Sequence, residues 1–492
     1  MSKSKKKHST EQTADYSKLY GFSIIAVVIA AVALFLWNSN LFQSNAPAVT
    51  INGKEYSAAD VNYYYTSVQQ YQSYLTLMGG STYDSSVPAK DQMYDEDHTW
   101  HDRLVEQAVE SLQQDVALAD LAQQKGHTLS EEGQESLKSS LTNLEASWIT
   151  AGYPNQKSYL KAVYGDSMTY DKLVECLNRA ALASDYYSAQ EATYEYTQAD
   201  LDAYYAENKN TLDTFVISQF LFQANVATTD EEGNTIEMTE DEKAAALESV
   251  KKDVKAKADD LYARLKAGED AQALMDEFSE DLGYSYVSSV LPGTSVSSQY
   301  ADWAYSAAKG DSTLVEYESS STSYIYCVAR VEDRYQDNTP SANVRHILIS
   351  AGTNPTEDDY NNALKEAEGL LEKFKNGEAT EDAFAQLAVE NSADSGSASN
   401  GGLLNVTPYS GYTQTFTDWA LAQKHTAGDT GIIKNDSSST KGYHIMYYVD
   451  QDLAYWMQNA EYALLNQDLA AWEKEIVSGY TAENGDGLKY VG

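Results

Sequence analysis

The feature that most constrains the fold is an internal repeat in the second half of this 492-residue chain. The first copy runs from Phe215 to about Asp337 and the second from Ala342 to about Gln451. Each copy begins with an apolar, β-branched segment, continues with a long amphipathic helix pattern and ends with another β-branched segment. Because a repeated sequence folds into a repeated structural unit, we expect two α+β domains in tandem, joined near residues 338–340.

The two copies correspond at several separate places along their length. Apolar residues recur at helical spacing from Val250 to Leu265 in the first copy and from Tyr360 to Phe374 in the second. The other matching segments, first copy before second, are Leu274–Ser279 with Leu387–Ser392, Asp281 with Asp394, Tyr300–Ala304 with Phe416–Ala420, and Lys309–Asp311 with Ala427–Asp429. We therefore expect the same order of helices and strands in both domains.

One imidazole lies on each of two β-branched segments of the second copy. The segments are Val344–Ile349 and Gly442–Ile445, and both are typical of buried strands. His346 and His444 occupy positions where a purely structural strand would carry another aliphatic side chain. A single strand histidine is more often a hydrogen-bonded core residue than a catalyst. Two of the seven histidines of the chain at these two positions favour a functional pair.

Between these strands lie the amphipathic helix, a second short helix pattern, the sequence Ser392-Ala393-Asp394-Ser395-Gly396-Ser397, and then Asn400-Gly401-Gly402. This order resembles the parvulin-type peptidyl-prolyl isomerases, which have an FKBP-like α+β fold. In that family the first and last strands lie side by side and carry a facing pair of histidines. The resemblance implies that residues 341–452 form an isomerase domain.

The resemblance also implies roles for individual residues. The implied catalytic residues are His346, Asp394 and His444, and the implied substrate-binding residues are Tyr412, Phe416, Leu421 and Thr440. Taken alone, Asp394 would be a turn residue, and Phe416 would be a core residue in any case. The chain departs from the family pattern where Gly-Gly-Asp-Leu-Gly becomes Gly401-Gly402-Leu403-Leu404-Asn405, and where Lys441 replaces a small hydroxyl residue.

The first copy, taken as residues 213–337, lacks both histidines. Gln219 is assigned to the position of His346, and Tyr324 to the position of His444. The double glycine is absent as well. We predict a degenerate parvulin-like domain without isomerase activity, with a role in peptide binding or spacing.

Residues 47–209 precede the repeat and are predicted to be mainly helical. After a short strand and turn at 49–54, helix patterns begin at Ser57 and Leu104 and continue at 131–151, 156–163 and 169–192. This block resembles the helical chaperone domain of the PrsA/SurA-like foldases. In that family the C-terminal helix returns to complete the chaperone domain, which implies the same for residues 454–492. An independent surface helix is the alternative.

The first residues predict a membrane anchor. Residues 1–18 are rich in lysine, and residues 19–42 include an uncharged stretch from Leu19 to Trp37. At about 1.5 Å per residue, that stretch makes a helix of roughly 28 Å, close to the thickness of a hydrocarbon core. The lysines before it indicate a single-pass protein of the cell membrane, with a cytoplasmic N-terminus and an extracytoplasmic body. A cleaved signal peptide is the alternative.

Composition excludes some classes of partner and ligand. The net charge of −40 argues against nucleic acid, whose phosphates would be repelled. Cys176 and Cys327 are the only cysteines and provide no disulfide framework for an exported protein. His98 and His101, with carboxylates nearby, are a weak candidate metal site, and a solvated loop is the preferred interpretation. We expect no metal or cofactor.

These observations predict a membrane-anchored, extracytoplasmic peptidyl-prolyl cis-trans isomerase that acts as a foldase for secreted proteins. The expected partners are unfolded or partly folded secreted chains with X–Pro bonds, and the membrane through residues 19–42. A non-catalytic holdase that binds proline-containing segments is the alternative, and a surface protein that binds metal through His98 and His101 is a third possibility. The sequence leaves open the client proteins and whether the chain forms a homo-oligomer.

Overall fold

A computed structural model describes residues 47–229, 232–436 and 439–492. Their contacts group into two compact units, one formed by residues 47–195 together with 465–492, and the other by residues 196–464. The expected basic segment (1–18) and membrane anchor (19–42) lie outside the described residues. Among the residues that are described, no helix is long and apolar enough to cross a membrane.

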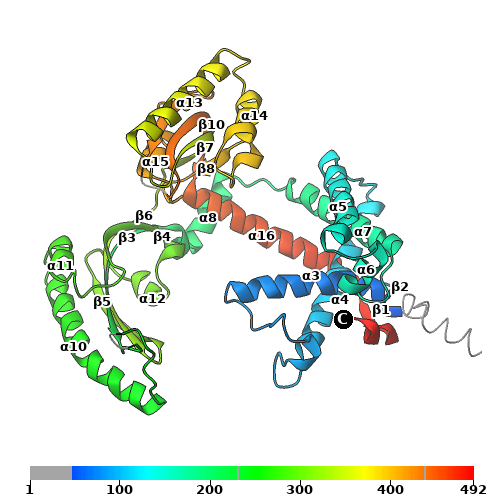
Figure 1. Cartoon of the computed structure of the whole chain (residues 1–492), viewed down its shortest axis with the longest axis horizontal. Coiled ribbons are helices and arrows are strands. Elements are labelled where there is room, and N and C mark those ends of the chain that lie inside the picture. Colours follow the sequence, from blue (N-terminus) through cyan, green and yellow to red (C-terminus); the bar gives the residue numbers. More distant parts are fainter. Residues whose placement is uncertain (1–46, 230–231, 437–438) are drawn as a thin grey trace, which may run out of the picture. The chain divides into compact units, whose positions relative to one another are not determined.

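The first unit is mainly helical, with a small sheet (Figure 1). Its elements are the strands β1 (Pro47–Ile51), β2 (Lys54–Ser57) and β11 (Ala482–Asn484), the helices α3 (Ala58–Leu77), α4 (Trp100–Gln124), α5 (Glu131–Thr150), α6 (Gln156–Tyr164) and α7 (Tyr170–Glu191), and the short helices η1 (Ala89–Asp91) and η4 (Asp486–Tyr490). The expected helices are thus confirmed. Ser57 and Asp60 form the capping box at the start of α3, and Thr99 and Asp102 form another at the start of α4.

The end of the chain packs on its beginning within this unit. The strand order is β11-β1-β2, and Val49 of β1 pairs with Asn484 of β11. The buried core combines Val49, Leu104 of α4 and Val491, each with no exposed surface. Part of α16 (Tyr455–Ser478) also belongs here, because Trp472 packs against α4 and α7.

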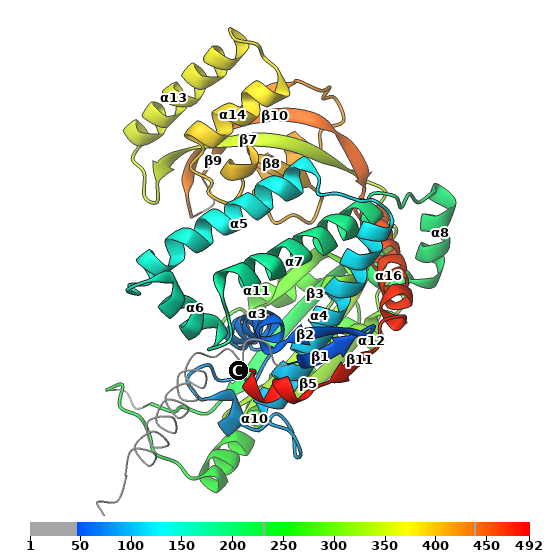
Figure 2. The same ribbon diagram turned by 90° about the vertical axis from the view of Figure 1, so that its right-hand side faces the viewer.

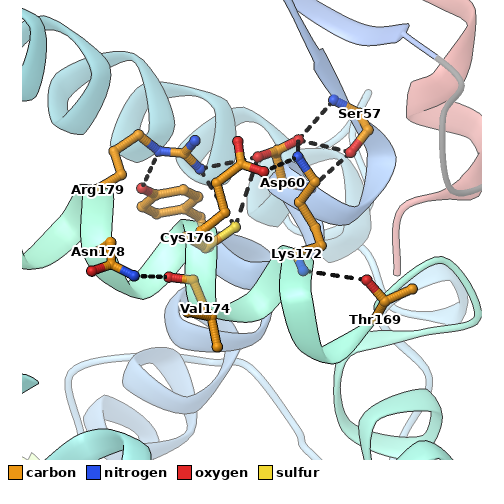
Figure 3. A network of polar contacts seen from close by, with 10 residues as sticks. Ser57, Asp60, Thr169, Lys172, Val174, Cys176, Asn178 and Arg179 are labelled. Atoms are coloured by element: carbon orange, nitrogen blue, oxygen red, sulfur yellow. Dashed lines mark hydrogen bonds and ion pairs between the residues drawn. The ribbon is translucent and has the colours of Figure 1, made fainter. Parts of the chain in front are cut away.

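A buried ionic cluster ties α3 to α7 (Figure 3). Asp60 is 1% exposed. Its Oδ1 lies 3.1 Å from Nη2 of Arg179, and its Oδ2 lies 3.4 Å from Nζ of Lys172. Burial acts to raise the pKa of Asp60, but hydrogen bonds from Ser57 and the two cations outweigh it, so this pKa lies below its ordinary value. A buried charge is tolerated here because it is fully paired.

The second unit contains two four-stranded antiparallel sheets with the same topology, β4-β3-β6-β5 and β8-β7-β10-β9. The strands are β3 (Thr214–Asn225), β4 (Tyr286–Pro292), β5 (Ser312–Ser320) and β6 (Ser323–Tyr335), then β7 (Pro340–Gly352), β8 (Leu403–Val406), β9 (Thr430–Asn435) and β10 (Lys441–Ala454). In each sheet the first and last long strands of the repeat form the central pair. This equivalence is the one that the internal sequence repeat predicts.

Two helices cover one face of each sheet and a short helix lies against the other. In the first sheet these are α10 (Glu240–Lys266) and α11 (Ala271–Glu277), opposite α12 (Ala301–Ala304) (Figure 1). In the second sheet they are α13 (Glu357–Lys375) and α14 (Glu381–Asn391) (Figure 2), and α15 (Gln414–Ala420) lies on the opposite face. Each sheet therefore separates two apolar cores, and the residues on its α12 or α15 face are available to line a site.

The strand register corrects one sequence assignment. Gln219 pairs with Ala329, and Leu221 pairs with Cys327. In the second sheet His346 pairs with Met446, and Leu348 pairs with His444. Cys327, and not Tyr324, is therefore equivalent to His444. Tyr324 lies three residues earlier on β6, and an odd shift along a strand turns the side chain to the opposite face, where Tyr324 packs with the α10 core.

Candidate isomerase site

Two central strands bring the two imidazoles of the second repeat together. Successive side chains of a strand point to opposite faces, so Ile347 and Ile445 enter the core beneath α13 and α14 while His346 and His444 point to the other face. The Nδ1 atoms of the two rings lie 3.0 Å apart. The residues are 3% and 8% exposed, so the pair forms a buried floor rather than a surface feature.

Asp394 and Ser397 complete a hydrogen-bonded chain behind this pair. Nε2 of His346 lies 2.9 Å from both Oδ2 of Asp394 and Oγ of Ser397. Ser397 Oγ donates to Asp394 Oδ2 over 2.6 Å, and the Gly396 N–H donates to Oδ1. An ionised carboxylate only accepts, so the Nε2–H of His346 donates to it. The Nδ1 of neutral His346 is then an acceptor, and the Nδ1–H of His444 donates to it.

The electrostatics of the site favour two neutral imidazoles beside one carboxylate. Burial lowers the pKa of His346, against the opposing effect of Asp394. Burial, followed by the proximity of His346, lowers the pKa of His444 to about 3. Burial acts to raise the pKa of Asp394, but the hydrogen bonds from Ser397 and Gly396 and the contact with His346 outweigh it and hold this pKa below its ordinary value. At neutral pH the hydrogen-bonded group of His346, His444, Asp394 and Ser397 carries a single negative charge, on Asp394.

The double glycine explains how the backbone behind His346 fits. The His346 N–H donates to the carbonyl oxygen of Gly402 over 2.9 Å. Gly402 has φ +71°, and a Cβ there would lie 2.1 Å from the His346 carbonyl oxygen. Gly401 is left-handed as well, and a Cβ there would lie 2.6 Å from that of Ala385. Only glycine allows both the conformation and the close approach.

Aromatic side chains form the wall above the imidazoles. Phe416 on α15 is 2% exposed and meets His346 and His444 edge to face, with ring centroids 5.5 and 5.1 Å away. The ring of Tyr412 lies 4.9 Å from that of Phe416. The resulting pocket has a volume of about 280 Å³, and its lining includes Thr440 and Asp394. This is a small pocket with an apolar wall and a polar floor.

The structure thus brings together His346, Asp394, His444, Tyr412, Phe416 and Thr440 around one pocket. Leu421 lies elsewhere, packed against the core cluster that contains Phe416 and Ala420. Sequence reasoning gave no role to Ser397, although this residue lies in the quoted Ser-Ala-Asp-Ser-Gly-Ser segment three residues after Asp394. That spacing was the available signal. The contributions of Leu348, Gly411 and Thr413 to the lining follow only from the loop conformation.

The comparison with known families agrees with this geometry. Residues 326–452 match the profile of the PPIC-type PPIase domain. This segment belongs to the parvulin-type peptidyl-prolyl isomerases. The parvulin domain as folded, β7 to β10, begins at Pro340, so the match starts within the last strand of the preceding sheet.

Relatives of known name are PrsA- and SurA-like. Chaperone SurA of Chromohalobacter salexigens is 28% identical over 251 residues, which cover 46% of this chain and 53% of that protein. Foldase protein PrsA 1 of Listeria innocua is 34% identical over 121 residues, 25% of this chain and 34% of that protein. The chain therefore spans about half, or less, of the length of these relatives. The crystal structure of the peptidylprolyl isomerase PrsA from Bacillus anthracis is 23% identical over 29% of this chain and 58% of that one, with a TM-score of 0.18.

In the first sheet, side chains occupy the place that corresponds to the isomerase pocket. Tyr300 stands where the parvulin domain has Phe416, and its hydroxyl donates to Oε1 of Gln219 over 2.9 Å. The hydroxyl of Tyr286 lies 3.2 Å from that of Tyr300. Tyr300 and Cys327 are each 2% exposed. The amide of Gln219 and the thiol of Cys327 thus stand where the second sheet has its two imidazoles, and the hydroxyls of Tyr300 and Tyr286 lie beside that amide.

His98 and His101, the weak candidate metal site, each contact another side chain instead of grouping as ligands. His98 precedes α4 in an exposed loop, where its Nδ1 contacts Asp95. His101 lies on α4, and its Nδ1 is 3.2 Å from the Tyr65 hydroxyl. Within residues 47–229, 232–436 and 439–492, no three histidine, cysteine or acidic side chains are grouped as metal ligands.

Proposed function

We propose that the protein is an extracytoplasmic foldase whose parvulin domain, residues 341–452, catalyses prolyl cis-trans isomerisation. The observation that carries the proposal is the buried pair His346–His444, joined to Asp394 and roofed by Phe416. We assign the catalytic role to these two histidines and Asp394, and substrate binding to Tyr412, Phe416 and Thr440. Anchoring through residues 19–42, with the body outside the cytoplasm, is part of the proposal and rests on the apolar segment and the lysines before it.

The reaction needs no bond to be broken. Rotation about an X–Pro bond has a barrier of about 20 kcal/mol, because the planar amide loses conjugation when it twists. A site that binds the twisted amide better than either planar form lowers this barrier. Phe416 and Tyr412 provide an apolar surface for the proline ring. Loss of conjugation makes the amide nitrogen more basic and the carbonyl less polar, which a largely apolar pocket favours.

The hydrogen bonds among Asp394, His346 and His444 hold the floor of the pocket in one conformation. Asp394 orients His346, and His346 orients His444, so neither ring turns as the substrate rotates. Neither nitrogen of His346 is free to attack the substrate, because Nε2 donates to Asp394 and Nδ1 accepts from His444. A preorganised polar floor acts without rearrangement during the reaction.

Exchange NMR on a short proline peptide separates an isomerase from a holdase. With catalytic amounts of the full chain, an isomerase produces exchange cross-peaks between the cis and trans proline signals on a timescale much shorter than the uncatalysed 10–100 s. A holdase broadens or shifts the signals of the bound peptide without producing exchange between the isomers. Peptide binding without exchange would refute the enzymatic proposal and leave the holdase.

We also propose that the helical unit binds client chains at the end of α3. Large apolar side chains are exposed there: Tyr71 is 58%, Leu77 is 84% and Met78 is 67% exposed. Tyr94, 45% exposed, lies near the same end of α3, where it lines a hollow with Leu75 and Gly79. Large exposed apolar side chains gathered near one helix end are typical of interaction surfaces.

The charges beside this patch indicate its partner. Asp95, Glu96 and Asp97 follow directly on Tyr94 and are exposed. The occupant that fits is an extended apolar segment of an unfolded chain flanked by lysine or arginine, because such a segment matches both the apolar surface and the acidic rim.

Substitution of the patch tests this assignment. Leu77→Ser with Met78→Ser should weaken the suppression of aggregation of an unfolded basic protein several-fold while leaving peptide isomerisation unchanged. Ile149→Ser is the matched control, because Ile149 is 64% exposed on α5 of the same unit and is not part of the patch. Equal loss in both variants, or loss in neither, would contradict a client site at α3.

A further inference from the structure

The segment between β8 and α15 carries most of one wall of the pocket. Gly411, Tyr412 and Thr413 line the pocket from this segment, and Phe416 follows within the first turn of α15. Thr413 also starts the helix, because its carbonyl oxygen accepts from the N–H of Phe416 over 2.9 Å. The position of the wall therefore depends on what holds the residues just before it.

Tyr409 ties this segment to two residues outside the parvulin domain. Its hydroxyl lies 2.5 Å from Oδ2 of Asp337 and 2.6 Å from Oγ1 of Thr214. The single hydrogen of the phenol donates to the carboxylate, so the hydroxyl of Thr214 donates to the phenol oxygen. Thr214 is the first residue of β3, and Asp337 follows β6, so both partners come from the first repeat.

The parvulin end of this connection is stiff. The Tyr409 N–H donates to Oγ1 of Thr407 over 3.1 Å, and the Thr407 N–H donates to Oγ of Ser410 over 2.8 Å. These bonds close a compact turn immediately before Gly411. A displacement of the Tyr409 ring should therefore also displace the residues of the pocket wall.

The part of the first repeat that contacts Tyr409 is also held by several contacts. Thr214 is 2% exposed. Its neighbour Asp213 accepts from Nε of Arg334 over 2.6 Å and from the hydroxyl of Tyr205 over 2.5 Å. The ring of Tyr409 also lies 4.9 Å from that of Tyr455, the first residue of α16. The hydroxyl thus meets a framework that is fixed by several independent contacts.

We propose that Tyr409 is a positioning residue for the proline pocket, and that the catalytically degenerate first repeat acts through Thr214 and Asp337 to set the pocket's wall. This role rests on the isomerase function proposed above. It gives the first repeat a contribution to catalysis that needs no active site of its own. The catalytic floor comes from β7, β10 and the turn at 394–397, so it does not depend on this anchor.

Kinetics of the full chain test the proposal. Tyr409→Phe and Thr214→Val should each raise KM for a proline peptide about three- to tenfold, the range expected for one hydrogen bond, with kcat changed less than twofold. Because Tyr409→Phe removes both hydrogen bonds of the anchor and Thr214→Val removes one of the same two, the double variant should be no worse than Tyr409→Phe alone. Tyr443→Phe is the control, since Tyr443 packs on the helix-covered side of the sheet, and it should match the wild type.

Hydrogen exchange gives a second result that does not require activity. Amides 411–416 should lose protection in Tyr409→Phe and Thr214→Val but keep it in Tyr443→Phe. Unchanged protection of these amides, or additive losses of kcat/KM in the double variant, overturns the role of Tyr409. An inactive wild type overturns the isomerase function instead, and the exchange pattern still decides whether the anchor exists.

Discussion

At the scale of single residues, the site depends on four side chains that fix one another's protonation. Asp394 accepts from Ser397 and His346, and His346 accepts from His444. Each proton has one position that satisfies both of its neighbours. Burial keeps the two rings neutral, and the hydrogen bonds keep the carboxylate ionised.

The depressed pKa of His444 predicts how the stability of the parvulin domain varies with pH. In the unfolded chain this imidazole takes a proton near pH 6.5, whereas in the folded protein it does so only near pH 3. Below about pH 6.5 the unfolded chain therefore binds a proton that the folded domain does not. The free energy of unfolding of the domain is at its full value above that pH and falls as the pH decreases towards 3. Urea unfolding between about pH 6 and pH 4 should show a slope of about 1.4 kcal/mol per pH unit from this one group.

His444→Leu should reduce that slope by about 1.4 kcal/mol per pH unit, the contribution of one proton. His98→Leu is the control, because His98 is exposed and bonded to Asp95, which raises its pKa. A His444→Leu protein with the same pH dependence as the wild type would mean that His444 titrates normally in the folded state.

Ser397 should matter although sequence reasoning gave it no role. Ser397→Ala removes the hydroxyl that donates to Asp394, so the pKa of Asp394 should rise towards its ordinary value. We expect kcat/KM for a proline peptide to fall roughly tenfold, the loss typical of a hydrogen bond to a charged group. The acid limb of the pH profile should move to higher pH.

Ser395→Ala provides the comparison for this experiment. Ser395 lies in the same turn and is exposed to solvent. Its substitution should leave both the rate and the pH profile unchanged. Equal effects at 395 and 397 would indicate that the turn, and not the Ser397 hydroxyl, is responsible.

At the scale of elements, the sequence predicted the strands better than their register. The apolar β-branched segments and the repeat located β7 and β10, and therefore the histidine pair. Tyr324 was assigned wrongly because an alignment of two divergent strands has no marker of register within the strand. The hydrogen-bonded ladder supplies that marker and selects Cys327. Similarly, the approach of Gly402 to His346 is a tertiary contact that no local pattern encodes.

The same approach makes Gly402→Ala a severe substitution. A left-handed conformation costs a non-glycine residue about 1–2 kcal/mol, and the added Cβ would also overlap the His346 carbonyl oxygen. We expect the free energy of unfolding to fall by more than about 3 kcal/mol and isomerase activity to be lost. Thermal unfolding and the peptide assay measure the two effects.

Gly352→Ala separates strain from overlap. Gly352 is the last residue of β7, the strand that carries His346. It has φ +100°, and nothing lies within 4 Å of a Cβ built there. This variant should lose only about 1–2 kcal/mol and remain active. Similar losses in the two variants would show that the close approach behind His346 is absent.

At the scale of the whole molecule, periodicity and capping residues were sufficient to predict a mixed helix-and-sheet chain, and the family resemblance identified the parvulin domain within it. The return of β11 to β1 pairs Val49 with Asn484, segments that lie at opposite ends of the described chain. The sequence suggested this return only through its family resemblance, because pairing between distant segments leaves no local pattern. The anchoring of Tyr409 by Thr214 is of the same kind, since it joins the two repeats.

The cysteines give a prediction at this scale. Cys176 and Cys327 belong to different units, both are buried, and both are free. Burial raises the pKa of each thiol to about 12. Ellman's reagent should therefore detect almost no thiol in the folded protein at pH 8 and two thiols per chain in denaturant without reductant. Fewer than two in denaturant would reveal a disulfide.

The measurement that tests the account most directly is kcat/KM of the full chain for a proline peptide, compared among wild type, His444→Ala and His98→Ala. We predict that His444→Ala loses about a hundredfold, since one preorganised polar group of the floor is removed, and that His98→Ala equals the wild type. If wild type and His444→Ala have the same rate, at background or above it, the paired imidazoles at the bottom of the pocket are not the catalytic site.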